Sequence, residues 1–165
     1  MRGWLLDTNV VSELRRPQPN PDVIDFVASQ RGEELYVSDV TIAEIVYGIE
    51  QLSDAARRAD LRSWLENTVR PLFARRVLAI TEEAIVRWKA MIVEGRKRGH
   101  TFGQPDLFIA AIAALQDLAV VTRDIDEFVE ARVPVFNPWT HRFYRHGNET
   151  RMRSPVTLEA ISKAR

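Results

Sequence analysis

Four acidic side chains in this sequence have positions that could bring them to one site: Asp7, Glu44, Asp106 and Asp124. Two carboxylates about 5 Å apart, at an effective dielectric constant of about 20, repel each other by about 3 kcal/mol. A cluster of four would take up protons or unfold locally unless a cation neutralised it. Ligation by oxygen alone, without Cys or His, favours Mg²⁺ or Mn²⁺. The acidic residues therefore predict a divalent-metal site if the fold brings them together.

Other kinds of reactive site are disfavoured by residue counts and spacing. The chain contains no cysteine, which excludes disulfide frameworks, thiolate metal sites and cysteine nucleophiles. Its three histidines, His100, His141 and His146, show no spacing typical of zinc ligands. The sequence therefore argues against zinc.

Short apolar runs alternate along the chain with segments of helical periodicity, and these elements must position the carboxylates. We expect strands at Gly3–Leu6, Leu35–Val37, Arg76–Ile80 and Leu118–Thr122. We expect helices at Asn9–Leu14, Asp22–Gln30, Thr41–Leu52, Ala55–Arg70, Glu82–Arg98 and Pro105–Asp117. This alternation predicts an α/β fold with a parallel sheet covered by helices.

Two of the carboxylates follow expected strands. Asp7 comes directly after the apolar run that ends at Leu6, and Asp124 comes just after Thr122. The C-terminal edge of a parallel sheet is where ligands bind in open α/β folds. Helix capping and turn formation explain aspartate at these positions equally well, so both interpretations stay open for each residue alone.

The other two carboxylates lie on expected helices. Glu44 lies away from the apolar stripe of its helix, and Gly48, one turn later, leaves room for something to approach at a cost of about 1 kcal/mol relative to alanine. Asp106 opens a helix that is apolar almost all round, and Ala110 and Ala113 are its small neighbours. Each residue also has a purely structural interpretation. Glu44 can be an ordinary solvated surface residue, and Asp106 can be an acidic residue that stabilises the first turn of its helix.

Length and charge bound the organisation of the chain. Its 165 residues fit one domain, and 23 Lys and Arg balance 23 Asp and Glu, which argues against nucleic-acid binding by bulk charge alone. Residues 141–165 nevertheless carry six Lys or Arg and two Glu. Such a basic segment is a solvated end, follows a phosphate backbone or docks on an acidic partner. We expect no membrane span and no signal peptide, and a cytoplasmic location.

Four sequence motifs together resemble the acidic motifs of PIN-domain ribonucleases. They are Leu5-Leu6-Asp7-Thr8-Asn9, Thr41-Ile42-Ala43-Glu44 with Gly48, Pro105-Asp106 leading into Ile109-Ala110-Ala111, and Thr122-Arg123-Asp124. Within that superfamily the chain is most similar to VapC toxins of the FitB branch, because Arg16-Pro17-Gln18-Pro19-Asn20 and Val135-Phe136-Asn137-Pro138-Trp139 also look like that branch. The resemblance covers about residues 3–139.

The resemblance implies a Rossmann-like parallel sheet flanked by helices, with a PIN domain at residues 1–140 and a basic extension at 141–165. It implies an Mg²⁺- or Mn²⁺-dependent ribonuclease of a type II toxin–antitoxin module. It also implies a homodimer and an antitoxin with a ribbon-helix-helix or similar DNA-binding domain, through which alone the chain would meet operator DNA.

The same resemblance assigns roles to individual residues. Asp7, Glu44, Asp106 and Asp124 match the acidic metal-binding positions, and Thr8, Asn9 and Thr122 are expected to support them. Many relatives have Asn at the position of Asp124 and Asp at that of Glu127, so Asp124, Asp126 and Glu127 all stay candidates for the fourth ligand.

We expect a metal-activated water to attack the phosphodiester bond, which needs no histidine base and leaves a 5′-phosphate and a 3′-hydroxyl. Candidate contacts to the RNA backbone are Arg96, Lys97, Arg98 and Arg123, although the first three also fit a solvated helix face. The alternatives are a non-catalytic PIN module acting through an antitoxin–DNA complex, a DNA-directed nuclease, and a phosphatase of the haloacid dehalogenase type. Against the phosphatase, Asn9 stands where that family needs a second aspartate.

Overall fold

The computed structural model describes residues 1–163. The strands are β1 (Gly3–Leu6), β2 (Leu35–Ser38), β3 (Val77–Leu78), β4 (Leu118–Val121), β5 (Val135–Asn137), β6 (Arg142–Arg145) and β7 (Asn148–Arg151). The α-helices are α1 (Thr8–Glu13), α2 (Pro21–Ser29), α3 (Asp39–Glu50), α4 (Ala55–Trp64), α5 (Arg70–Leu72), α6 (Glu82–Lys97), α7 (Gln104–Gln116), α8 (Asp126–Glu130) and α9 (Leu158–Lys163). None of the helices in this part of the chain is long and apolar enough to cross a membrane.

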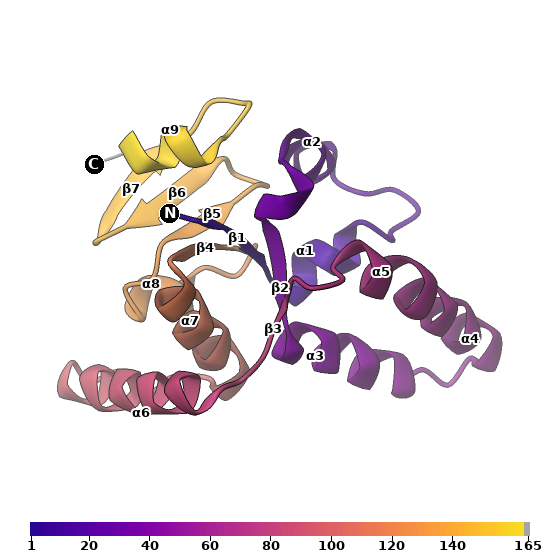
Figure 1. The fold of residues 1–165 in the computed structure, drawn as a ribbon, viewed down its shortest axis with the longest axis horizontal. Helices are drawn as coiled ribbons and strands as arrows, with labels where there is room; N and C mark the ends of the chain where they lie inside the picture. Colours follow the sequence, from indigo (N-terminus) through magenta and orange to yellow (C-terminus); the bar gives the residue numbers. More distant parts are fainter. Residues whose placement is uncertain (164–165) are drawn as a thin grey trace.

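The strands form one sheet in the order β3-β2-β1-β4-β5-β6-β7 (Figure 1). β3, β2, β1, β4 and β5 are parallel, which confirms the predicted parallel sheet. β6 and β7 add an antiparallel hairpin at the β5 side. Because β1 and β4 are parallel neighbours, residues that follow their C-terminal ends meet at one edge of the sheet.

Both faces of the sheet are buried, and β1 contributes to each. Trp4 and Leu6 belong to one apolar cluster, together with residues of α1, α2 and α3, whereas Leu5 belongs to the other, with residues of α6 and α7. Alternate side chains of a strand point to opposite faces, so helices must cover both sides of a sheet with such strands. The second cluster includes all the buried residues of α7, as its largely apolar sequence predicts.

The helical segment expected at Ala55–Arg70 differs from the structure in its second half. It is α-helical only to Trp64, continues as a π-helical turn over Leu65–Val69, and ends with α5. The amide of Arg70 donates to the carbonyl of Leu65 in that turn. Pro71 explains the wider turn, because proline has no amide hydrogen and its ring clashes with the carbonyl four residues earlier.

Part of the C-terminal segment packs on the domain, although many of its residues are exposed, as one of the alternatives for this segment predicts. Phe143, Val156 and Ile161 are buried in the cluster that contains Trp4. The Gln30 side chain links the two parts, since its amide nitrogen donates to the Val156 carbonyl at 2.9 Å while its oxygen accepts from Trp4 Nε1 at 2.9 Å. The domain boundary proposed at residue 140 stays a prediction.

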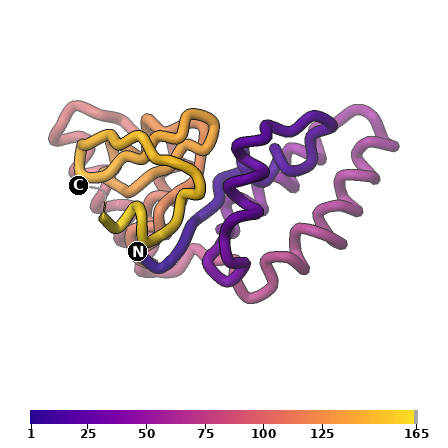
Figure 2. Tube along the Cα trace, turned by 90° about the horizontal axis from the view of Figure 1, so that it is seen from above, coloured from indigo at the N-terminus to yellow at the C-terminus, as the bar shows by residue number. Residues whose placement is uncertain are grey.

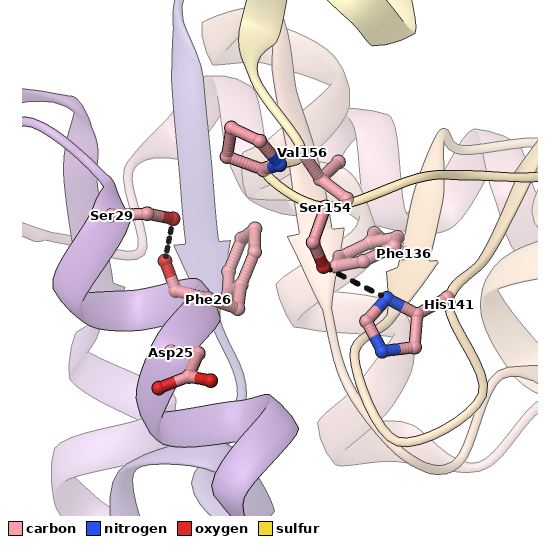
Figure 3. Close-up of a pocket in the computed structure, with 8 residues that line it drawn as sticks. Asp25, Phe26, Ser29, Phe136, His141, Ser154 and Val156 are labelled. Atoms are coloured by element: carbon pink, nitrogen blue, oxygen red, sulfur yellow. Dashed lines mark hydrogen bonds between the residues drawn. The ribbon is translucent and has the colours of Figure 1, made fainter.

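A pocket of about 260 Å³ lies between α2 and this C-terminal segment. Figure 3 shows Phe26 of α2 facing Phe136, His141 and Ser154 across it. Asp25 is the one acidic residue in its lining. Figure 2 shows the hairpin and α9, in orange and yellow, at the opposite end of the molecule from α4, in magenta.

Candidate active site

Asp7 is the central carboxylate of the acidic edge. It is 5% exposed and stands between the end of β1 and the start of α1, which it caps. Oδ1 accepts from the Thr8 amide at 2.7 Å, and Oδ2 accepts from Thr122 Oγ1 at 2.7 Å. Burial raises the pKa of Asp7, the hydrogen bonds from Thr122 and Thr8 lower it, and the charges of Glu44 and Asp124 raise it, with a net increase. Both interpretations of the sequence therefore hold, since Asp7 is a helix cap and also part of an acidic cluster.

Asn9 connects the two strand ends through its side-chain amide. Its Nδ2 lies 3.2 Å from Asp7 Oδ2, 2.8 Å from Thr122 Oγ1 and 3.3 Å from Asp124 Oδ2. Its Oδ1 accepts from the Arg123 amide at 3.1 Å. The loop after β4 is thus fixed relative to the first turn of α1, so Asp7 and Asp124 are held on the same side of the sheet edge.

Glu44 reaches this edge from α3. Thr8 Oγ1 donates to Glu44 Oε2, while the Thr8 backbone amide donates to Asp7. Glu44 is half-buried, and Gly48, one turn later, is exposed, with no atom within 4 Å of where a Cβ would stand. Both residues line a groove of about 370 Å³. The room that the sequence suggested beside Glu44 is present.

Asp106 completes the cluster from the first turn of α7. Burial raises the pKa of Asp106 to about 6, and the negative charges of Asp7, Glu44, Glu127 and Asp124 add to the increase in that order. Within residues 1–163 its carboxylate accepts no hydrogen bond and forms no ion pair. The four predicted carboxylates therefore share one electrostatic environment, and Asp106 is the least compensated of them.

The structure separates the three candidates for the fourth acidic position. Asp124 is hydrogen-bonded to Asn9, and its backbone amide donates to Thr122 Oγ1 at 3.1 Å. Glu127 Oε2 lies 3.3 Å from the Gly103 amide and 3.4 Å from His100 Nε2, and its charge acts on Asp106. Asp126 is exposed, and within residues 1–163 its carboxylate forms no side-chain hydrogen bond or ion pair. Asp124 and Glu127 both belong to the acidic edge, and Asp126 does not.

The predicted RNA-binding cations lie on two parts of the surface. Arg96, Lys97 and Arg98 are exposed at the C-terminal end of α6, where Arg98 Nη2 donates to the Glu130 carbonyl at 2.7 Å. Arg123 lies at the acidic edge itself, with Nε 3.8 Å from Asp124 Oδ1. Among these four, Arg123 is the one that the structure brings next to the carboxylates.

Asn137 and Trp139 belong to this edge and were missed as site residues from the sequence. Asn137 is 7% exposed, and its Nδ2 donates to the Arg123 carbonyl at 3.0 Å. The Arg123 guanidinium carbon lies 5.7 Å from the centre of the Trp139 ring. The signal that could have found Asn137 is the one that pointed to Asp7, a polar residue directly at the end of a buried apolar run.

The donor set at this edge fits a hard divalent cation in its chemistry. All candidate ligands are carboxylates. Within residues 1–163, Arg123 is the one positively charged side chain within 4 Å of any of the four predicted carboxylates. Within residues 1–163, however, no three acidic or histidine side chains are already arranged to hold an ion. Glu44 and Asp106 are half-buried and Asp124 is exposed, so three of the four carboxylates are accessible to solvent.

These observations define a class of protein: an α/β domain with carboxylates gathered at the C-terminal edge of its parallel strands. The family model described as PIN domain matches residues 4–133. The chain belongs to the PIN domain family, which confirms the resemblance and the fold expected from the sequence.

Known proteins of this family resemble most of the chain. Toxin FitB of Neisseria gonorrhoeae is 38% identical over 135 residues, which cover 82% of this chain and 97% of FitB. VapC ribonuclease Y4jK of Sinorhizobium fredii is 34% identical, with coverage of 82% and 96%. The solved structure of FitAcB from Neisseria gonorrhoeae has a TM-score of 0.79 and 38% identity, and covers 82% of this chain and 98% of that one.

Proposed function

We propose that this chain is the ribonuclease toxin of a type II toxin–antitoxin pair and hydrolyses RNA phosphodiester bonds with the help of Mg²⁺ or Mn²⁺. Relatives that match most of the chain are named as a toxin and as a ribonuclease. The observation that carries the proposal is the fixed position of Asp7, held by Thr122 and Thr8 within the electric field of Glu44 and Asp124. A site of this kind attracts a cation and so can bind the phosphate of a nucleic acid.

Some residues of the chain would bind the cation, and others orient the residues that bind it. Asp7, Glu44 and Asp106 would hold the cation, and Asp124 or Glu127 would complete its ligands. A bound ion of this type lowers the pKa of a bound water and neutralises charge that develops on the phosphate. Thr122 and Asn9 fix the orientation of Asp7 by hydrogen bonds, and Arg123 provides a positive charge for the RNA backbone beside the carboxylates.

The end groups of the cleaved RNA test the chemistry. Attack by water leaves a 5′-phosphate and a 3′-hydroxyl, because the RNA 2′-hydroxyl takes no part. A 2′,3′-cyclic phosphate among the products would contradict the proposal.

The Asp7→Asn variant tests the site. It should lose more than about 100-fold in cleavage rate, since even a partner of a ligand contributes about 10- to 100-fold. Circular dichroism should report a folded protein. An unchanged rate would mean that the Asp7 carboxylate is structural.

The partners follow from the same relatives. Solved structures similar to this chain include FitAB bound to an IR36 DNA fragment, with 37% identity and a TM-score of 0.78. We propose that this chain dimerises, pairs with an antitoxin that has a ribbon-helix-helix or similar DNA-binding domain, and contacts operator DNA only through it, in the cytoplasm. A short open reading frame next to the gene, whose product copurifies with the chain and suppresses RNA cleavage, is the expected finding.

A non-catalytic PIN module that acts through an antitoxin–DNA complex is the second candidate. The observation in its favour is that FitAB, whose structure is similar to this chain with 37% identity, has been solved bound to a DNA fragment. Titration with Mg²⁺ and Mn²⁺ by calorimetry, combined with RNA cleavage, separates the two. Cation uptake with cleavage supports the nuclease, whereas neither uptake nor cleavage supports the binding module.

A further inference from the structure

The β6–β7 hairpin lies outside the region matched by the family model, which ends at residue 133. It continues the sheet on the side of β5, so it also continues the edge at which the carboxylates lie. Asn137, at the C-terminal end of β5, pairs with Arg142, and Arg142 pairs with Arg151. Because β5 is parallel to β4 and β1, Arg142 and Arg151 stand at the same edge as Asp7 and Asp124.

The spacing of the strands places these arginines within reach of the same ligand. Neighbouring strands lie about 4.8 Å apart, so the three steps from β4 to β7 span about 14 Å. Arg123 and Trp139 lie between the carboxylates and the hairpin, with the guanidinium of Arg123 over the indole ring. The edge therefore presents carboxylates, then a cation on an aromatic ring, then a group of arginines.

The hairpin arginines are only partly neutralised. Residues 142–153 contain four Arg and one Glu. Glu149 pairs with Arg142, whereas Arg151 and Arg153 are exposed and form no ion pair within residues 1–163. Like charges directly opposite each other on paired strands, as at Arg142 and Arg151, are destabilising. A bound anion would relieve this repulsion.

We propose that this edge, from Arg123 and Trp139 to Arg142, Arg151 and Arg153, is a binding track for the single-stranded RNA that flanks the scissile phosphate. The arginines bind backbone phosphates, and the partly buried Trp139 ring supports the Arg123 guanidinium at this edge. This inference rests on the proposed ribonuclease function and adds to it a substrate-binding surface built by the C-terminal extension. Positively charged surfaces that follow the phosphate backbone bind single strands in this way, without reading sequence.

RNA fits this surface better than an acidic protein does because the track is continuous with the carboxylates of the proposed reaction site. A single strand bound at those carboxylates can continue along the sheet edge onto the hairpin, where Arg142 and Arg151 stand. An acidic partner needs no such continuity. Antitoxin binding is therefore the competing outcome to be measured.

Charge removal on the hairpin tests the track in the full-length chain. The variant Arg151→Ala with Arg153→Ala should raise KM for a single-stranded RNA about tenfold and leave kcat unchanged. Binding to the same RNA in EDTA should show a salt dependence whose slope falls by about 0.7 per lost phosphate contact, or about 1.4 in all. Stepwise shortening of the RNA from one end, but not from the other, should abolish the difference between variant and wild type.

Two variants serve as controls. Arg2→Ala with Arg31→Ala removes two exposed charges that precede β1 and β2, at the opposite edge of the sheet, and should leave KM and the salt slope unchanged. Arg151→Lys with Arg153→Lys keeps the charge and should bind RNA like the wild type. Loss of RNA binding in the lysine variant would overturn the inference, because it would indicate a structural role of the guanidinium groups.

The results also separate this inference from the function on which it rests. If the wild type cleaves RNA but the alanine variant has unchanged KM and salt slope, the track is wrong and the nuclease proposal stands. If the alanine variant loses affinity for the antitoxin and keeps its affinity for RNA, the surface binds the acidic protein and the inference is also overturned. If the wild type neither binds nor cleaves RNA, the nuclease proposal fails first.

Discussion

Thr122 Oγ1 donates a hydrogen bond of 2.7 Å to Asp7 Oδ2, across a separation of 115 residues in the sequence. Thr122 is fully buried and follows β4, whereas Asp7 follows β1. The same hydroxyl oxygen accepts from the Asp124 amide at 3.1 Å. One threonine therefore fixes both the central carboxylate and the loop that carries Asp124.

Replacement of Thr122 by valine removes this hydroxyl while it keeps the shape of the side chain. Asp7 then loses one donor, and the Asp124 amide loses its acceptor, so we expect RNA cleavage to fall about 10- to 100-fold. The free energy of unfolding should fall by about 1–3 kcal/mol because buried polar groups are left unpaired. Thr122→Ser should restore cleavage, and its failure to do so would assign Thr122 a packing role.

The raised pKa of Asp106 predicts how stability depends on pH. An unfolded aspartate has a pKa near 3.8, and the folded one is raised to about 6, so the folded state binds the proton more tightly. Protonated Asp106 stabilises the fold below about pH 4, and this contribution disappears as the pH rises through about 6. Urea unfolding of the metal-free protein should therefore show a steeper loss of stability over this interval in the wild type than in Asp106→Asn.

A divalent cation should oppose that loss. If Asp106 is a ligand, Mg²⁺ should raise the melting temperature more at pH 7.5 than at pH 5, because protons compete with the ion for the carboxylate. Asp106→Asn should reduce this effect at pH 7.5. Equal stabilisation by Mg²⁺ at both pH values would place the ion elsewhere.

The fourth acidic ligand can be identified by three matched amide variants. Asp124→Asn and Glu127→Gln remove carboxylates whose charges act on Asp106, whereas Asp126→Asn removes an exposed carboxylate that forms no ion pair within residues 1–163. We expect calorimetry to show weaker Mn²⁺ binding for Asp124→Asn or Glu127→Gln and unchanged binding for Asp126→Asn. A marked loss in the Asp126 variant would reassign the ligand.

Gly48 offers a test of the open space beside Glu44. Glycine inside a helix costs about 1 kcal/mol relative to alanine, and a Cβ at this position of α3 would meet no atom within 4 Å. Gly48→Ala should therefore raise the free energy of unfolding by about 0.5–1 kcal/mol. Reduced RNA cleavage in this more stable variant would show that a ligand uses the space, and unchanged cleavage would show that it does not.

Local sequence was sufficient for the elements before Asp54 and for part of the site. β1 agrees with its predicted bounds, and the helices before Asp54 begin and end within two residues of the expected ones. The positions of Asp7 and Asp124 followed from a general rule, since both come after parallel strands. That rule could not find Glu127, whose charge acts on Asp106 from α8, an element that lies beside α7 only after folding.

The sequence by itself determined the α/β alternation and the acidic residues at the strand ends, because hydrophobic periodicity and strand ends are properties of neighbouring residues. Only the tertiary structure decided that Asn9 joins Asp7 to Asp124, that Asn137 fixes Arg123, and that the C-terminal segment becomes part of the sheet. The side-chain amides of Asn9 and Asn137 bind residues that are far apart in the sequence or lie in separate loops. The hairpin can pair only with the free edge of β5. Such contacts depend on which surfaces meet after folding, and no periodicity in the chain encodes them.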